Sequence, residues 1–187
     1  KMKSKTFNYI IKTMNGMALG LFSTLIIGTI IATISSFLPG GVIKDALDTL
    51  ASVLKNSMGL GIGIGIAFSL KLEGLKLISA GVAGQIAVYS VKGYAIGDPL
   101  VIYLVVIGAI EISRLILFKK TSVDIILIPL VFALISVFIT MIIYEPVSYV
   151  TTLIGDFVQT ATVYQPFIMG VVISVIMGMA LTAPISS

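Results

Sequence analysis

Hydrophobic residues along this chain gather in long runs that short polar, glycine-rich or proline-containing breaks separate. A run of about 20 apolar residues is typical of a helix that crosses a membrane, because that length spans the hydrocarbon core. The runs predict six membrane segments, at 14–38, 58–70, 72–91, 99–118, 123–143 and from 166 to the end. A helix satisfies the hydrogen bonds of its own backbone in lipid. The predicted fold class is therefore all-α, a polytopic transmembrane helix bundle.

Two further segments show a different pattern. In 42–56 the apolar residues recur at helical spacing with lysines and aspartates opposite them, and 147–164 is mildly amphipathic. Such segments form helices that lie in a membrane interface or pack on their own bundle. Pro39 and Pro146 are expected to end the helices that precede them, because proline removes a backbone donor.

The 58–70 segment is short for a span. Thirteen helical residues reach about 20 Å, less than the roughly 30 Å hydrocarbon core. Two interpretations stay open: the span begins earlier, within 54–57, or the segment is a half-helix. Broken helices of this kind are common in transporters.

The order of features hints at an internal repeat. Units 14–70 and 123–185 each contain a long span, a proline stop, an amphipathic segment and a span with glycine, and Pro39 superposes on Pro146. Solute sites of transporters tend to lie where such repeats meet. Residues 1–187 are interpreted as one transmembrane domain. Because no charged residue follows the last span, the chain is expected to be part of a longer permease.

Composition narrows the function classes. The chain is 58% hydrophobic and 11% charged, whereas soluble domains carry about 25% charged residues. A soluble enzyme and a nucleic-acid-binding protein are excluded, and the lipid bilayer is the expected partner. Cysteine and histidine are both absent, so neither a thiol nucleophile nor the commonest metal ligand exists. We expect no cofactor, no metal site and no intramembrane enzyme.

The basic residues predict the orientation. Lysine and arginine favour cytoplasmic loops, and six spans with a cytoplasmic N-terminus place nine of the 12 basic residues inside. These nine are Lys1, Lys3, Lys5, Lys12, Lys71, Lys76, Arg114, Lys119 and Lys120. The expected location is a bacterial plasma membrane, with a multi-pass chain and a cytoplasmic N-terminus.

Four stretches resemble a known family. They are Asn15–Ile30, Gly59–Lys71, Ser79–Ala87 and Gly178–Ser187, and they are similar to the EIIC-like membrane proteins of the bacterial sugar phosphotransferase system, in particular to its second EIIC-type family. The resemblance implies an integral permease that moves a small solute, a sugar or another small organic molecule, by alternating access. It also implies a homodimer as one assembly of the chain.

One departure from that family bears on chemistry. The resemblance implies a His and a Glu near the sugar, and partner domains with phosphorylated His or Cys, but this chain contains neither His nor Cys. Sugar phosphotransfer is therefore not expected within these residues. A second hypothesis, based on the scarcity of polar groups, is a non-transporting membrane sensor, regulator or partner-binding scaffold with an EIIC-like fold.

Glu111 is the charged residue that lies most clearly inside a predicted span. An unpaired carboxylate at membrane depth is costly, and Arg114 follows at a spacing that allows an ion pair on the same helix face. One interpretation makes Glu111 a site for solute or proton coupling. The other makes it half of a structural pair that reaches the cytoplasmic interface.

Two segments carry the signature of a broken helix. Gly61 and Gly63 either let helices approach closely or let a helix unwind toward a solute. Thr182, Pro184 and Ser186 combine a helix-breaking proline with small hydroxyl residues that can line the opening. We treat all five as candidate solute-binding residues.

Two uncharged amides are also candidates. Asn15 and Gln85 lie within predicted spans, where each amide needs a hydrogen-bond partner. A hydrogen bond to a neighbouring helix is one interpretation, and contact with a solute is the other.

Overall fold

The computed structural model describes residues 2–89, 98–117 and 123–164, together with the helical residues 167, 170–172, 174 and 175. The described residues form helices and no strand, which confirms the predicted all-α class. In chain order the elements are α1 (Met2–Leu21), the π-helical turn η1 (Phe22–Ile26), α2 (Ile27–Ser36), α3 (Val42–Asn56), α4 (Met58–Ser69), α5 (Leu75–Tyr89), α6 (Pro99–Ile116) and α7 (Asp124–Tyr164).

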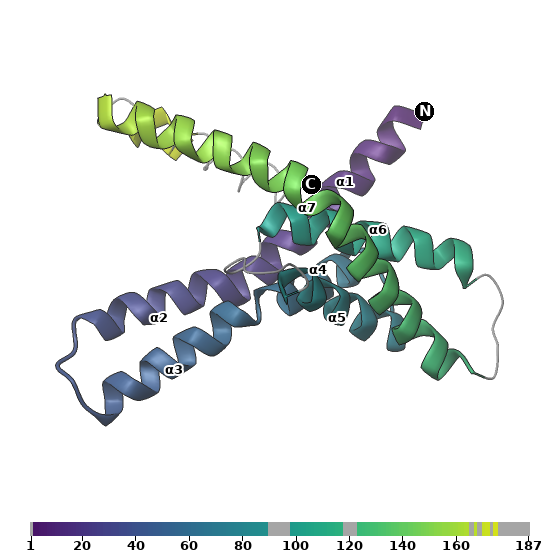
Figure 1. Ribbon diagram of the computed structural model, residues 1–187, viewed down its shortest axis with the longest axis horizontal. Helices are drawn as coiled ribbons and strands as arrows, with labels where there is room; N and C mark the ends of the chain where they lie inside the picture. The colour runs from purple at the N-terminus through teal and green to yellow at the C-terminus, as the bar shows by residue number, and fades with distance from the viewer. Residues whose placement is uncertain are drawn as a thin grey trace.

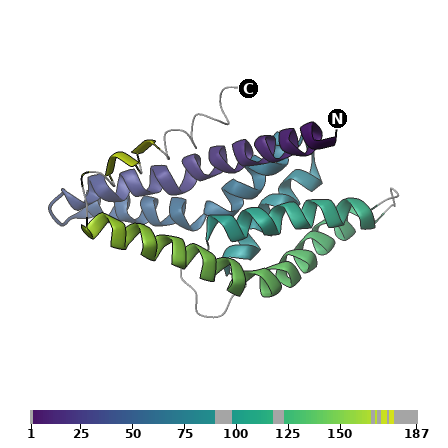
Figure 2. The same cartoon turned by 90° about the horizontal axis from the view of Figure 1, so that it is seen from above.

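Helices α4 and α5 lie at the centre of the molecule, where α1, α6 and α7 cross them (Figure 1). Helices α2 and α3 run side by side as a hairpin that projects to one side. The last half of α7 projects toward that same side (Figure 2). The molecule is therefore a central bundle with two helical extensions.

The contact between α1 and α4 depends on glycine. A Cβ atom on Gly65 would collide with the backbone of Gly16, and one on Gly20 would collide with the backbone of Gly61. Small residues let membrane helices approach until their backbones touch, which replaces the hydrophobic driving force that lipid removes. Since the pairs run in opposite order along the two helices, α1 and α4 are antiparallel.

The apolar core fills the space between α4, α5, α6 and α7. Fully buried residues of this core include Ile62 and Ile66 of α4, Ile102 and Val105 of α6, and Phe132 of α7. Because lipid chains are as apolar as these side chains, close packing rather than exclusion of water holds the core together in a membrane.

Three described helices are long and apolar enough to cross a membrane: Lys5–Ser36, Pro99–Ile116 and Asp124–Asp156. A fourth crossing results if α3 and α4, bent by 48° at their junction, form one broken span. Helix α5 is apolar but has only 15 residues. The described residues thus contain three or four of the six predicted spans as helices of full length, and most of the segment from 166 onward lies outside them.

Two helix boundaries differ from the prediction. The first helix begins at Met2 and not near residue 14, because the polar residues before the apolar run are also helix formers. The expected stop at Pro146 is wrong, since α7 continues through it, and 147–164 is part of α7 rather than a separate helix. Pro39 does follow a helix end, and the next two residues are glycines, with Gly41 at φ 155°. Pro146 has no such neighbours.

The amphipathic helix predicted over 42–56 is confirmed as α3. It packs along α2, where the Ser35 hydroxyl donates to Asp48 Oδ1 at 2.5 Å and Lys44 forms an ion pair with Asp48 at 3.6 Å. Gly28 of α2 lies against Ala51. Of the two places expected for this segment, the structure shows the packed one.

Candidate functional site

The junction between α3 and α4 is held open by a side chain from α5. Gln85 Nε2 donates to the carbonyl oxygen of Asn56 at 2.6 Å, and Gln85 Oε1 accepts from the amide of Leu60 at 2.9 Å. In an unbroken helix the Leu60 amide would donate directly to the Asn56 carbonyl, four residues earlier. The Gln85 amide is thus inserted into one rung of the helix, and such an insertion is a known cause of sharp kinks. It contributes to the 48° bend at Ser57, where the Ser57 amide also donates to the Leu54 carbonyl at 3.2 Å.

A second irregularity lies beside this junction. The π-helical turn η1 interrupts the first long helix, and Thr24 within it is buried. A Cβ atom on Gly61 would lie 2.7 Å from Thr24 Cγ2, so η1 packs against the first turns of α4. Single π-helical turns occur frequently at functional sites. The two departures from regular helix therefore meet at one level of the bundle.

A pocket of about 340 Å³ adjoins the junction. It is lined by Leu60, Val82, Gln85, Ile86 and Tyr89. Leu60, Val82 and Tyr89 are exposed, so this pocket is an open depression on the outer face of α4 and α5. Gln85 is thus shared between the helix junction and the pocket wall.

The two glycines proposed from the sequence lie in helix contacts. Helix α4 is regular from Met58 to Ser69, so it is not unwound at Gly61 or Gly63. A Cβ atom on Gly63 would collide with the backbone of Ala80 in α5. Close packing explains both glycines, and the discontinuity lies just before them, at Ser57.

Glu111 lies at a contact between α1 and α6. Its Oε1 accepts from the Tyr9 hydroxyl at 2.5 Å and from Arg114 Nη1 at 2.6 Å. The ion pair to Arg114, expected from their spacing, is confirmed. A second bridge joins the same helices at the hydroxyls of Thr13 and Tyr103, 2.8 Å apart. Through these contacts Glu111 helps to hold α1 against α6. The Glu111 side chain is nevertheless 46% exposed.

The remaining candidates are placed as follows. Asn15 is half-buried on α1, and within the described residues no hydrogen bond engages its side chain. Thr182, Pro184 and Ser186 lie outside the described residues.

Sequence reasoning missed three contributors to these sites. They are Tyr9 and Tyr103, which bond across the α1–α6 contact, and Ser57, where the helix bends. A polar Asn56-Ser57 pair directly before a glycine-rich apolar run is the signal that marks the bend in the sequence.

Helix ends rich in basic residues gather at one end of the bundle. Lys5 and Lys12 at the start of α1 line a pocket with Lys71, which follows the end of α4. The Tyr9 contact brings Arg114, near the end of α6, to the same region. All four basic residues belong to the set predicted to be cytoplasmic.

Long apolar helices, a bent helix pair and glycine-lined contacts define a polytopic, all-α integral membrane protein. Comparison with protein families matches residues 11–187 to the family described as "Phosphotransferase system, EIIC". The chain belongs to this family, as its resemblance implied, and the family supports a role as a membrane permease. EIIC domains are transporter components rather than catalytic phosphotransferases. No curated protein and no solved structure matches the chain.

Proposed function

We propose that this chain moves a small organic solute, of which sugars are one class, across the bacterial plasma membrane by alternating access, and that it binds the solute at the junction of α3 and α4. The observation that carries the proposal is the Gln85 amide, which occupies a backbone donor and a backbone acceptor at the edge of a pocket.

The chemistry of the junction suits a polyhydroxy solute. Broken membrane helices offer free backbone N–H and C=O groups to a ligand. Here the Leu60 amide and the Asn56 carbonyl do not bond to each other as they would in a continuous helix. The Gln85 side chain bonds to both of them instead. A hydroxyl group is both donor and acceptor. A solute hydroxyl can therefore replace the Gln85 amide without leaving either backbone group unpaired, and an unpaired group would be costly in lipid.

The proposal includes a cytoplasmic N-terminus. It is supported by the gathering of Lys5, Lys12, Lys71 and Arg114 at one end of the bundle, because lysine and arginine favour the cytoplasmic side. It also retains the second broken segment, with Thr182, Pro184 and Ser186, as the other half of the solute site.

The test is solute flux in proteoliposomes. Proteoliposomes that contain the protein are loaded with a panel of radiolabelled hexoses and polyols. The efflux of each solute is compared with its efflux from liposomes without protein. We expect faster efflux of at least one member, a strong reduction in Gln85→Leu, and wild-type flux in Gln159→Leu. Gln159 is an exposed glutamine of α7, so this control makes the same substitution away from the junction.

A negative result in the flux assay would contradict the proposal. If no member of the panel leaves faster than from empty liposomes, and the protein instead co-purifies with a protein partner, the transport proposal fails. The sensor or scaffold hypothesis would then hold.

A further inference from the structure

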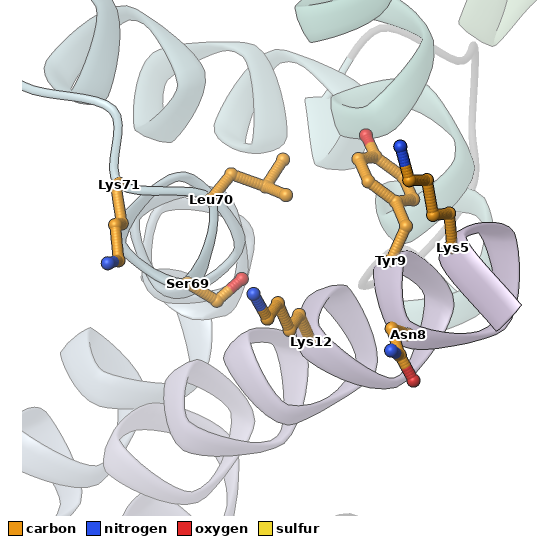
Figure 3. A pocket seen from close by; sticks show the side chains of 7 residues that line it. All are labelled: Lys5, Asn8, Tyr9, Lys12, Ser69, Leu70 and Lys71. Atoms are coloured by element: carbon orange, nitrogen blue, oxygen red, sulfur yellow. The ribbon is translucent and has the colours of Figure 1, made fainter.

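Three lysines from two helix ends line one pocket of about 370 Å³. Its walls are formed by Lys5, Asn8, Tyr9, Lys12, Ser69, Leu70 and Lys71 (Figure 3). The first four belong to α1, and the last three come from the end of α4 and the residues that follow it. No acidic side chain is among these residues.

The side chains border the pocket from different directions. Lys12 points from α1 toward Ser69, Lys5 lies beside the Tyr9 ring, and Lys71 lies on the other side of the α4 end (Figure 3). Lysine side chains thus border the pocket on both the α1 side and the α4 side.

The ammonium groups of these lysines lack an acidic partner within the described part of the chain. No carboxylate there lies within ion-pair distance of Lys5, Lys12 or Lys71. Glu111, whose oxygen accepts from Tyr9, already pairs with Arg114. Like charges that line one pocket repel, and an anion between them relieves the repulsion.

The backbone at Lys71 gives an independent observation. Its φ is 57°, in the left-handed region, where its amide and that of Leu72 close the end of α4 onto Phe68 and Ala67. Glycine is the usual residue at this position, because a Cβ atom is disfavoured there. The chain thus carries a lysine at a position whose backbone favours glycine, and strain of this kind is often tied to a site.

We infer that this pocket binds a phosphate group, carried either by a small soluble phosphate compound or by an anionic lipid headgroup. Lysine binds phosphate as a compact point charge, and basic pockets between membrane helices on the cytoplasmic side hold lipid headgroups. The three ammonium groups neutralise the anion and donate hydrogen bonds to its oxygens. This site goes beyond the proposed function, because it lies at the opposite end of α4 from the junction with α3.

The experiment has two arms, both on the full chain in nanodiscs of neutral phosphatidylcholine. In the first, inorganic phosphate and glycerol phosphate are titrated in by calorimetry. In the second, phosphatidylglycerol is added to the discs, and thermal stability is compared with discs of phosphatidylcholine alone. We expect saturable binding of a soluble phosphate in the first arm, or a higher unfolding temperature with phosphatidylglycerol in the second. The arm that responds identifies the source of the phosphate.

Variants then test the pocket itself. Loss of one charge-assisted contact weakens binding by about tenfold, so Lys12→Gln is expected to lower the affinity by that factor. Lys12→Arg keeps the charge and is expected to keep the affinity, which separates binding from folding. Lys76→Gln removes an equal charge from α5 outside the pocket and is expected to leave the affinity unchanged. The inference is overturned if neither arm shows binding or stabilisation. It is also overturned if Lys12→Gln and Lys76→Gln lower the affinity equally. Neither result depends on the flux assay.

Discussion

Replacement of Gln85 by leucine tests the origin of the bend between α3 and α4. Leucine is apolar and of similar size, so the change removes the amide with little change in packing. The Asn56 carbonyl and the Leu60 amide then lose their partners. They can bond to each other, which straightens the helix, or stay apart and unpaired. Both results differ from the wild type.

The size of each effect follows from the structure. Hydrogen bonds between membrane helices contribute about 0.6–1.7 kcal/mol each, so loss of two lowers the free energy of unfolding by about 1–3 kcal/mol if the bend persists. If the rung closes, the glycine contacts hold α4 and the movement falls on α3. Helix α3 has 15 residues and is therefore about 22 Å long. Full straightening through 48° would carry its far end by at most about 18 Å, and α2, which packs along α3, would have to move with it.

Spin labels measure the movement directly, because the chain contains no cysteine. Cysteines at Val42, at the far end of α3, and at Leu115 in α6 are introduced at exposed positions, and their distance is measured by pulsed electron resonance with and without Gln85→Leu. Unfolding in mixed micelles gives the stability, with Gln159→Leu as the control. An unchanged distance together with an unchanged stability would refute the role of the amide.

Three further predictions concern other contacts, each checked by unfolding in mixed micelles. Gly65→Ala brings a Cβ atom against the Gly16 backbone and is expected to lower stability by about 1–3 kcal/mol or more, whereas Gly155→Ala, in open space, is expected to be neutral or to stabilise by about 0.5–1 kcal/mol; equal effects would contradict the α1–α4 contact. Glu111→Gln weakens a half-exposed ion pair and is expected to lower stability by at most about 1 kcal/mol with hexose flux retained; loss of flux would instead assign Glu111 to coupling. Lys71→Gly relieves the left-handed backbone and is expected to stabilise by about 1 kcal/mol relative to Lys71→Ala, and a more stable Lys71→Ala would contradict the backbone argument.

Local signals account for the parts of the fold that the sequence predicts well. Helix α6 begins where Asp98 caps the Leu100 amide at 2.8 Å and Pro99 occupies the first turn, a pattern that is visible in the sequence. The α3 boundaries are equally local, set by Gly41 and the amphipathic period. The stop expected at Pro146 failed because proline weakens one rung only, and the apolar residues around it continue the helix.

In the candidate sites too, contacts within one helix are predictable from the sequence, whereas contacts between helices are not. The pairing of Glu111 with Arg114 was predicted, because it depends on spacing within one helix. The contact of Glu111 with Tyr9 joins residues far apart in the chain, and no periodic pattern contains it. Gln85 was recognised as a polar residue that needs a partner, but its partners are backbone groups at a bend that only the packing of α3, α4 and α5 creates.

Helix α4 connects the two proposed sites and limits how the protein can move. It has 12 residues, so it is a rod about 18 Å long, with the bend at Ser57 at one end and Lys71 of the basic pocket at the other. Its glycine faces touch the backbones of α1 and α5. Rotation of α4 about its own axis would therefore force side chains such as Ile62 into those backbones. The places left for a change of shape are the bend, where the Gln85 amide occupies one rung between α3 and α4, and η1, which joins α1 to α2. A change in access at the junction is therefore expected to move the α2–α3 hairpin against a fixed α1–α4–α5 core.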